Sequence, residues 1–253
     1  KALSPRTSVT ESPISKRKRN VELIAANLQV PHFRETCLHR DEYRCVVTQV
    51  MDFSLWKSIN QPPDILYGDM EVAHIIPFVY ASWRDISGEK NTANIWEVLF
   101  RCFPSLRRTG MRAANINDPS NGITLWDVIR KQFGKFRCAF EPTDTPHVYN
   151  FKTYLGYPAQ SAFSPPDRKI TMRNAPGAED VASPSRVLLE CHWRVAEILN
   201  ASGMGETIDQ IIQEWEDIKE GDDGHACLRE DGKSNVSGFL TAALWANGHW
   251  VKS

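Results

Sequence analysis

Four residues with ionisable or strongly polar side chains stand at the edges of two apolar segments. Glu71 and His74 belong to a run that ends in Ile-Ile-Pro. Asn121 precedes a second apolar run, and Arg130 lies nine residues after Asn121. An imidazole exchanges a proton near pH 7, a carboxylate can ligate a divalent cation, and a guanidinium binds carboxylates or phosphates through paired hydrogen bonds. Such groups can support acid–base chemistry beside an anion or a metal ion.

Each of these residues also has a purely structural interpretation. A single His between apolar residues is commonly a core histidine, and His74 fits that description. Asn before Gly is typical of a turn, as at Asn121. Arg130 has two acidic residues, Asp127 and Glu71, as alternative partners for an ion pair. From the residues alone these alternatives stay open.

Short strands and helices are expected to position these residues. Apolar runs rich in β-branched and aromatic residues predict strands, and apolar residues three or four apart predict helices. The expected elements are a helix over 31–41, strands over 43–48 and 69–76, a helix over 92–103, a helix from Thr124 to Gly134 and a strand over 136–141.

The C-terminal part of the sequence has the clearest helical pattern. One helix is expected from Ser185 to Gly203, and a second over 207–221, where Thr207 and Gln210 form a capping-box pattern. The short Gly-containing connection predicts an antiparallel helical hairpin packed on the rest. The segment 142–184 contains seven of the fifteen prolines and is expected to be an extended, irregular connection.

These elements indicate an α+β fold in four parts. A mobile basic arm over 1–30 is followed by a core over 31–150, which contains a long insertion over 78–118. An extended Pro-rich connection over 151–184 then leads to a helical extension over 185–253.

Charge is distributed unevenly along a chain whose net charge is −1. Residues 101–137 carry eight Lys or Arg and two Asp, a net charge of +6, whereas 206–231 carry ten acidic and two basic residues, a net charge of −8. Such separation can create a basic face for nucleic acid despite a neutral total, although an ordinary solvated surface is an equal alternative. Arg107, Arg108 and Arg112 are the expected substrate-binding residues of that face.

Cysteine content and hydropathy indicate an intracellular protein. The six cysteines are scattered without a C-x-x-C pair, which argues against a disulfide scaffold or a Cys-based zinc site. No apolar run approaches the roughly 20 residues of a membrane span, so no membrane partner is expected. The run from Lys16 to Arg19 is interpreted as a nuclear-import signal, a phosphate-binding patch or an ordinary solvated arm.

Three segments together resemble the HNH endonuclease domain found in many fungal proteins: residues 38–48 (Leu-His-Arg-Asp-Glu-Tyr-Arg-Cys-Val-Val-Thr), Glu71 to Pro77, and Asn121 to Leu125. The C-terminal helices resemble the helical tail of those proteins. The resemblance implies a ββα-metal core, in which a divalent cation stabilises charge on the scissile phosphate while a His deprotonates water. In that scheme His74 matches the general base, and Asn121 matches the residue that hydrogen-bonds the loop after it.

The metal site departs from the family pattern. The helix position of a metal-ligating His is Arg130, and a guanidinium has no lone pair to offer a cation. Ala73 and Gly134 stand where acidic residues or His are often found, which leaves Glu71 and Asp69 as replacement ligands. A divalent ion (Mg²⁺, Mn²⁺ or Zn²⁺) is therefore expected to bind weakly or not at all.

Three functions remain from the sequence. The first is a protein derived from a metal-dependent phosphodiesterase acting on nucleic acid, with weakened or lost nuclease activity. The second is a metal-free cyclase, isomerase or lyase, in which His74 is the acid/base and Arg130 holds an anionic small-molecule substrate. The third is a non-catalytic interaction protein.

Overall fold

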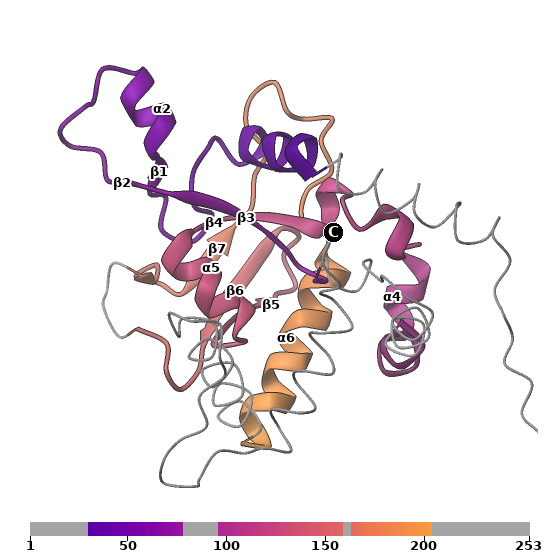
Figure 1. Cartoon of the computed structure of the whole chain (residues 1–253). Coiled ribbons are helices and arrows are strands. Elements are labelled where there is room, and N and C mark those ends of the chain that lie inside the picture. The colour runs from indigo at the N-terminus through magenta and orange to yellow at the C-terminus, as the bar shows by residue number, and fades with distance from the viewer. Residues whose placement is uncertain (1–29, 78–95, 159–162, 204–253) are drawn as a thin grey trace, which may run out of the picture.

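Helices and three small β-sheets make up an α+β fold in the part of the chain that a computed structural model describes, residues 30–77, 96–158 and 163–203 (Figure 1). The mobile arm, the first part of the insertion (78–95) and the second C-terminal helix were predicted over residues that lie outside these ranges. The four-part division therefore stays a prediction. Within the described residues no helix is long and apolar enough to cross a membrane.

A two-stranded antiparallel sheet and one helix form the centre of the fold. Strand β3 (Met70–His74) pairs with β4 (Gly122–Trp126), so that the Cα of His74 lies opposite Gly122, and α5 (Asp127–Gly134) follows β4 directly. The predicted helix ends at Gly134 as expected, but its expected start at Thr124 is wrong. Because Ile123, Thr124 and Leu125 are all fully buried, this apolar run is a covered strand, which periodicity does not distinguish from a helix.

The helix at residues 30–40 agrees with the prediction, but the strand expected over 43–48 does not form. The chain instead turns back on itself: the Cys45 amide donates to the Val50 carbonyl at 2.9 Å, and Gln49 has a φ of 61°. The turn leads into the short strand β1 (Met51–Asp52). The chain then forms α2 (Phe53–Ser58) and continues to β2 (Tyr67–Gly68), which pairs in parallel with β1.

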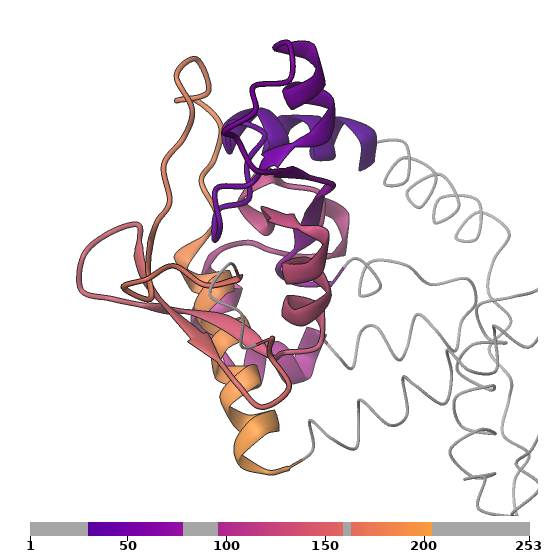
Figure 2. The same cartoon turned by 90° about the vertical axis from the view of Figure 1, so that its left-hand side faces the viewer.

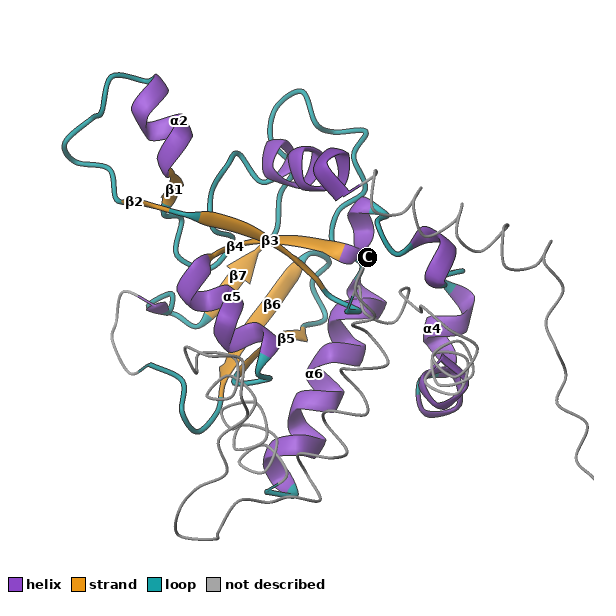
Figure 3. Ribbon diagram, viewed as in Figure 1, coloured by secondary structure: helices purple, strands orange, loops and turns teal. Residues whose placement is uncertain are grey.

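A three-stranded antiparallel sheet lies beside this centre, in the order β5 (Cys138–Pro142), β6 (Val148–Thr153) and β7 (Lys169–Thr171) (Figure 3). The strand expected over 136–141 is thus confirmed with a small shift. The irregular connection expected over 142–184 is wrong, because it contains β6 and β7. Tyr149 and Phe151 alternate on the buried face of β6, a strand pattern that the surrounding prolines obscured.

Helix α6 (Arg186–Ala201) confirms the helix predicted from Ser185 and packs along β5. In both views it lies at the opposite end of the molecule from the helix at 30–40 (Figures 1 and 2). The helix at residues 96–102 and α4 (Pro104–Arg108) pack at its side, and the first of these falls within the helix expected over 92–103. Short 3-10 turns, η2 (Ala113–Asn115) and η3 (Pro119–Asn121), then lead the chain back to β4.

Candidate functional site

His74 is the last residue of β3, and its ring is held on two sides. The Phe33 ring stacks on it with centroids 4.3 Å apart and planes inclined by 18°. His74 Nε2 lies 2.9 Å from Asn117 Oδ1. Because an amide oxygen only accepts hydrogen bonds, this contact is a hydrogen bond in the tautomer whose Nε2 carries the proton. Neither Phe33 nor Asn117 was singled out from the sequence, since no local spacing links them to His74.

The surroundings of His74 lower its pKa. Burial disfavours the charged imidazolium and is the largest cause, and the positive charge of Arg130 acts in the same direction. The hydrogen bond to Asn117 raises the pKa and only partly offsets them. The ring is therefore neutral at pH 7, the form that a general base requires.

Asn121 fixes the segment that follows His74. Its side chain is fully buried: Oδ1 accepts from the Ile76 amide at 2.8 Å, and Nδ2 donates to the carbonyls of Ile76 and Ile116 at 3.1 and 2.9 Å. Its own carbonyl accepts from the Ile75 amide at 2.8 Å. The bracing contact expected of Asn121 is thus present. Because a buried amide with three partners resists displacement, the loop after His74 has one well-defined path.

Sequence reasoning missed a buried ion pair that fixes the η3 turn, the turn that ends at Asn121. Arg40 is fully buried and contacts the two Asp41 carboxylate oxygens, each at 2.8 Å. Its remaining N–H groups donate to the carbonyls of Pro119, Gly122 and Ala182 at 2.7, 2.9 and 3.1 Å. These bonds tie the helix at 30–40 to both ends of the η3 turn. The sequence signal for this ion pair was the adjacent Arg40 and Asp41, but adjacent charged residues in a helix usually lie on its exposed surface.

Asp41 extends this clamp to the central sheet. Its Oδ2 accepts from the Thr124 amide at 3.0 Å, while the Thr124 hydroxyl donates to the Cys37 carbonyl at 3.3 Å. The helix at 30–40 therefore holds β4 as well as the turn before it. The same helix supplies Phe33, so the position of the His74 ring depends on how this helix docks.

Arg130 on α5 forms an ion pair with Glu71 on β3, with Nε 3.0 Å from Oε2. The Arg130 and Glu71 side chains are about half exposed, at 50% and 47%. Asp127, the other expected partner, instead pairs with Lys131 at 3.5 Å. Arg130 thus pairs with Glu71, one of the two acidic partners considered from the sequence, and its positive charge still lowers the pKa of His74.

The described residues do not fit a metal ion at this site. Nowhere in the described ranges do three His, Cys, Asp or Glu side chains lie close enough to hold one. Glu71, the predicted metal ligand, faces a permanent cation. A catalytic zinc ion typically has about three protein ligands, and the site offers His74 alone beside an engaged carboxylate.

The three arginines predicted to bind substrate lie on α4 and in the loop after it, with exposed side chains. Arg107 is 3.7 Å from a Glu97 carboxylate oxygen, and its guanidinium carbon is 5.4 Å from the centre of the Phe100 ring. Arg112 precedes the η2 turn, and the chain then continues to Asn117, the partner of His74. The basic segment and the His74 site are thus linked by one stretch of chain, and the binding role of these arginines stays a prediction.

Comparison with known proteins gives one family match. Residues 45–141 match a family model described as HNH endonuclease, and this stretch contains β3, β4 and α5 with His74, Asn121 and Arg130. The helix at 30–40, with its Arg40–Asp41 clamp, and α6 lie outside the matched stretch. No curated protein and no solved structure gives a significant match.

Proposed function

With residues 45–141 similar to HNH endonucleases, we propose that this protein binds nucleic acid through its phosphates on a scaffold that has lost metal-dependent cleavage. The observation that carries the proposal is the ion pair between Arg130 and Glu71. It stands on α5 and β3, where the resemblance to the family leads us to expect a helix His as a metal ligand.

Electrostatics opposes a cation at this place. Two unit charges about 4 Å apart interact by about 4 kcal/mol at the effective dielectric constant of a protein surface, and a divalent ion doubles that repulsion. Glu71 offsets part of it but is already neutralised by Arg130. A single imidazole at His74 does not supply the remaining coordination energy, so metal-assisted attack on phosphate lacks its metal.

The same charges favour a phosphate. A half-exposed ion pair such as Arg130–Glu71 contributes roughly 0–1 kcal/mol to stability. A phosphate oxygen can therefore displace Glu71 at little cost and accept two N–H groups of the guanidinium fork. The neutral ring of His74 neither repels the anion nor adds a charge. The exposed Arg107, Arg108 and Arg112 extend the positive surface along the chain that leads to this site.

Binding of a fluorescent DNA duplex, followed by anisotropy at several salt concentrations in EDTA, tests the proposal. We expect binding without metal, and a log–log salt slope that falls by about 0.9 for each phosphate contact removed. Arg130→Gln should weaken binding more than Lys131→Gln, a matched loss of one charge on the same helix. Absence of binding at low salt, equal effects of the two variants, or cleavage of DNA with added Mg²⁺ would each contradict the proposal.

One observation favours a second function, a metal-free acid/base enzyme. His74 has a lowered pKa and so is neutral at pH 7, and it lies within the electrostatic reach of Arg130, which could hold an anionic small molecule. This function becomes the leading one if DNA does not bind. It requires a reaction whose rate falls as His74 becomes protonated and that is lost in His74→Ala.

A further inference from the structure

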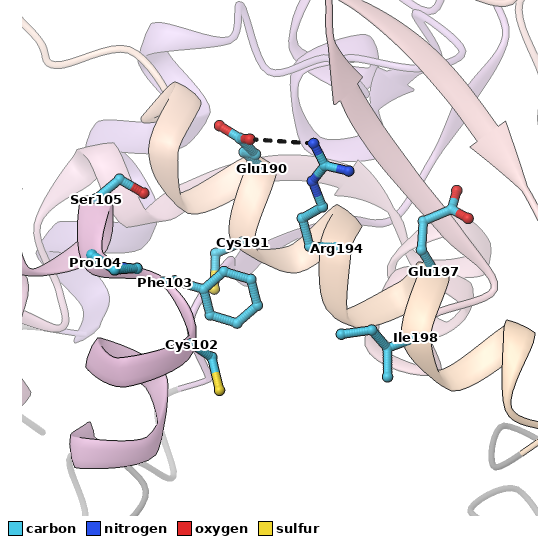
Figure 4. A pocket seen from close by; sticks show the side chains of 9 residues that line it. All are labelled: Cys102, Phe103, Pro104, Ser105, Glu190, Cys191, Arg194, Glu197 and Ile198. Atoms are coloured by element: carbon cyan, nitrogen blue, oxygen red, sulfur yellow. Dashed lines mark ion pairs between the residues drawn. The ribbon is translucent and has the colours of Figure 1, made fainter.

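A groove of about 490 Å³ lies on the side of α6, far along the chain from His74. Figure 4 shows Cys191 and Ile198 of α6 facing Cys102 and Phe103 across it, with Pro104 at the start of α4. The floor is therefore mainly apolar and contains two thiols. The two walls belong to segments about ninety residues apart in the sequence, which the fold brings together.

The groove leaves apolar surface open to solvent, and its charged lining residues are Arg194 and two glutamates, Glu190 and Glu197. The Ile198 side chain is 62% exposed although it sits on a helix whose other face is in the core. Arg194 lies at the rim, 3.8 Å from Glu190 and over the Trp193 ring at 4.1 Å. An occupant with an apolar stripe would cover this apolar surface.

The sequence after α6 has this character. Residues 207–221 repeat isoleucine and tryptophan at helical spacing, with acidic residues between them. The apolar stripe consists of Ile208, Ile211, Ile212, Trp215 and Ile218. Residues 206–231 carry a net charge of −8, from ten acidic and two basic residues. The stripe thus matches the apolar floor of the groove, whereas the rim, with Glu190 and Glu197 beside Arg194, does not itself attract acidic residues.

The short connection after α6 and the length of the stripe fit a second helix that runs antiparallel to α6 along the groove. Helix α6 ends at Ala201, and Gly203 has a φ of 71°, a conformation that suits a helix terminus. Short connections between helices place them antiparallel as neighbours. At 1.5 Å per residue, the stripe from 208 to 218 would span about 15 Å, and the groove from Ile198 back to Glu190 spans about 12 Å.

The positive neighbours of the groove are the arginines predicted to bind nucleic acid. Arg107 and Arg108 lie in the last turn of α4, the helix whose first residues line the groove. Arg101 directly precedes Cys102, and its 76% exposed side chain pairs with Glu97, which also lies 3.7 Å from Arg107. Acidic residues held in the groove would therefore lie near these guanidinium groups and compete with phosphates for them.

We propose that residues 207–221 dock as an antiparallel helix in the groove between α6 and residues 102–105, and that their acidic flank screens Arg107 and Arg108. The protein thus carries its own competitor for nucleic acid. The docking stands on the groove and the sequence pattern alone, whereas the screening rests on the proposed function.

Cys102 reports docking, because it is exposed in the described structure and lines the groove. Alkylation of the full chain, mapped by peptide mass spectrometry to separate Cys102 from Cys227, measures its protection. Cys138 serves as an internal reference, since it is fully buried away from the groove lining and burial raises the pKa of its thiol. We expect slow modification of Cys102 in the wild type and at least tenfold faster modification in Ile212→Asp.

Two further variants make this result specific. Gln213→Asp adds the same charge one residue away, on the opposite face of the predicted helix, and should keep Cys102 protected. Ile198→Asp changes the groove instead of the tail at an exposed position, so it should fold normally and expose Cys102 as Ile212→Asp does. Equal reactivity in all four proteins would overturn the docking. Protection that vanishes on dilution would assign the groove to the tail of a second copy and overturn the intramolecular arrangement.

DNA binding by the same proteins tests the screening. Ile212→Asp and Ile198→Asp should bind a duplex several-fold more tightly than the wild type and Gln213→Asp at low salt. Unchanged affinity with an exposed Cys102 would overturn the screening and leave the docking intact. Absence of DNA binding by every variant, with Cys102 still protected only in the wild type and Gln213→Asp, would overturn the proposed function and not the docking.

Discussion

The Arg130 guanidinium nitrogen Nε lies 3.0 Å from the Glu71 carboxylate, so that α5 and β3 are joined by an ion pair beside His74. An imidazole at position 130 would instead present a lone pair to the same region. Under the proposed function, the residue at position 130 therefore decides whether this place favours a cation or an anion. The residue at position 130 should therefore affect both the metal affinity of the site and the pKa of His74.

Metal affinity should appear when Arg130 is replaced by His. We expect the wild type to show no saturable binding of Zn²⁺ or Mn²⁺ by calorimetry, because Glu71 is paired and His74 is the single imidazole at the site. Arg130→His removes the repelling charge, frees Glu71 and adds a ligand, which gives the three protein ligands typical of an open zinc site.

Lys131→His is the matched control for metal binding, since it places an imidazole one residue away on the exposed side of α5. It should leave the metal affinity at the level of the wild type. Micromolar binding by the wild-type protein that is abolished in His74→Ala would contradict the assignment of an anion site.

The pKa of His74 should move in opposite directions in two variants. Arg130→Gln removes a nearby positive charge and should raise the pKa, whereas Asn117→Ala removes a hydrogen bond that raises it and should lower the pKa. NMR titration of the imidazole protons measures both shifts, with Lys131→Gln as the control for α5. An unchanged pKa in Arg130→Gln would show that the two side chains do not share a site.

The short motifs around His74 and Asn121 point to a candidate site from the sequence, because each residue stands where an apolar run begins or ends. Their functional roles stay predictions. The end of α5 at Gly134 and the extent of α6 followed from apolar spacing. β4 was assigned to a helix because a strand buried on both faces has no alternation to reveal it.

Other parts of the fold depend on contacts between residues that are distant in the sequence. Nothing local marks Arg40 as a buried residue, because its burial depends on carbonyl groups 79 to 142 residues away. Phe33 and Asn117 likewise meet His74 only after the helix at 30–40 and the η3 region have docked. The short strands β6 and β7 pair across a proline-rich stretch whose composition favours loops.

Replacement of Arg40 should destabilise the protein more than any single change at the ion pair of α5. Arg40→Met leaves the buried Asp41 carboxylate without its cationic partner and removes one donor from each of three carbonyl groups. Loss of one partner of a buried pair typically costs about 3–5 kcal/mol. Urea denaturation measures the free energy of unfolding, and Arg130→Met, at a half-exposed pair, should cost at most about 1 kcal/mol.

Stability should decline in mild acid because of a second buried histidine. His192 is stacked between Phe133 and Phe136, with ring centroids 3.8 and 4.7 Å away, and its Nε2 lies 3.1 Å from the Phe133 carbonyl oxygen. Its Nδ1 has no hydrogen-bond partner in the described part of the chain. Burial lowers the pKa of His192 from 6.5 to about 3 in the folded protein.

Acid lowers the free energy of unfolding because the unfolded chain binds a proton that the folded protein does not. Between pH 6.5 and about pH 3 the unfolded chain holds a proton on His192 that the folded protein does not, so acid favours unfolding. The free energy of unfolding should fall by up to about 1.4 kcal/mol per pH unit through this residue, and His74 acts in the same direction. Urea denaturation between pH 7.5 and 4.5 measures the slope. His192→Phe should flatten it and the exposed His39→Gln should not; equal slopes in all three proteins would exclude His192 as the acid-sensitive group.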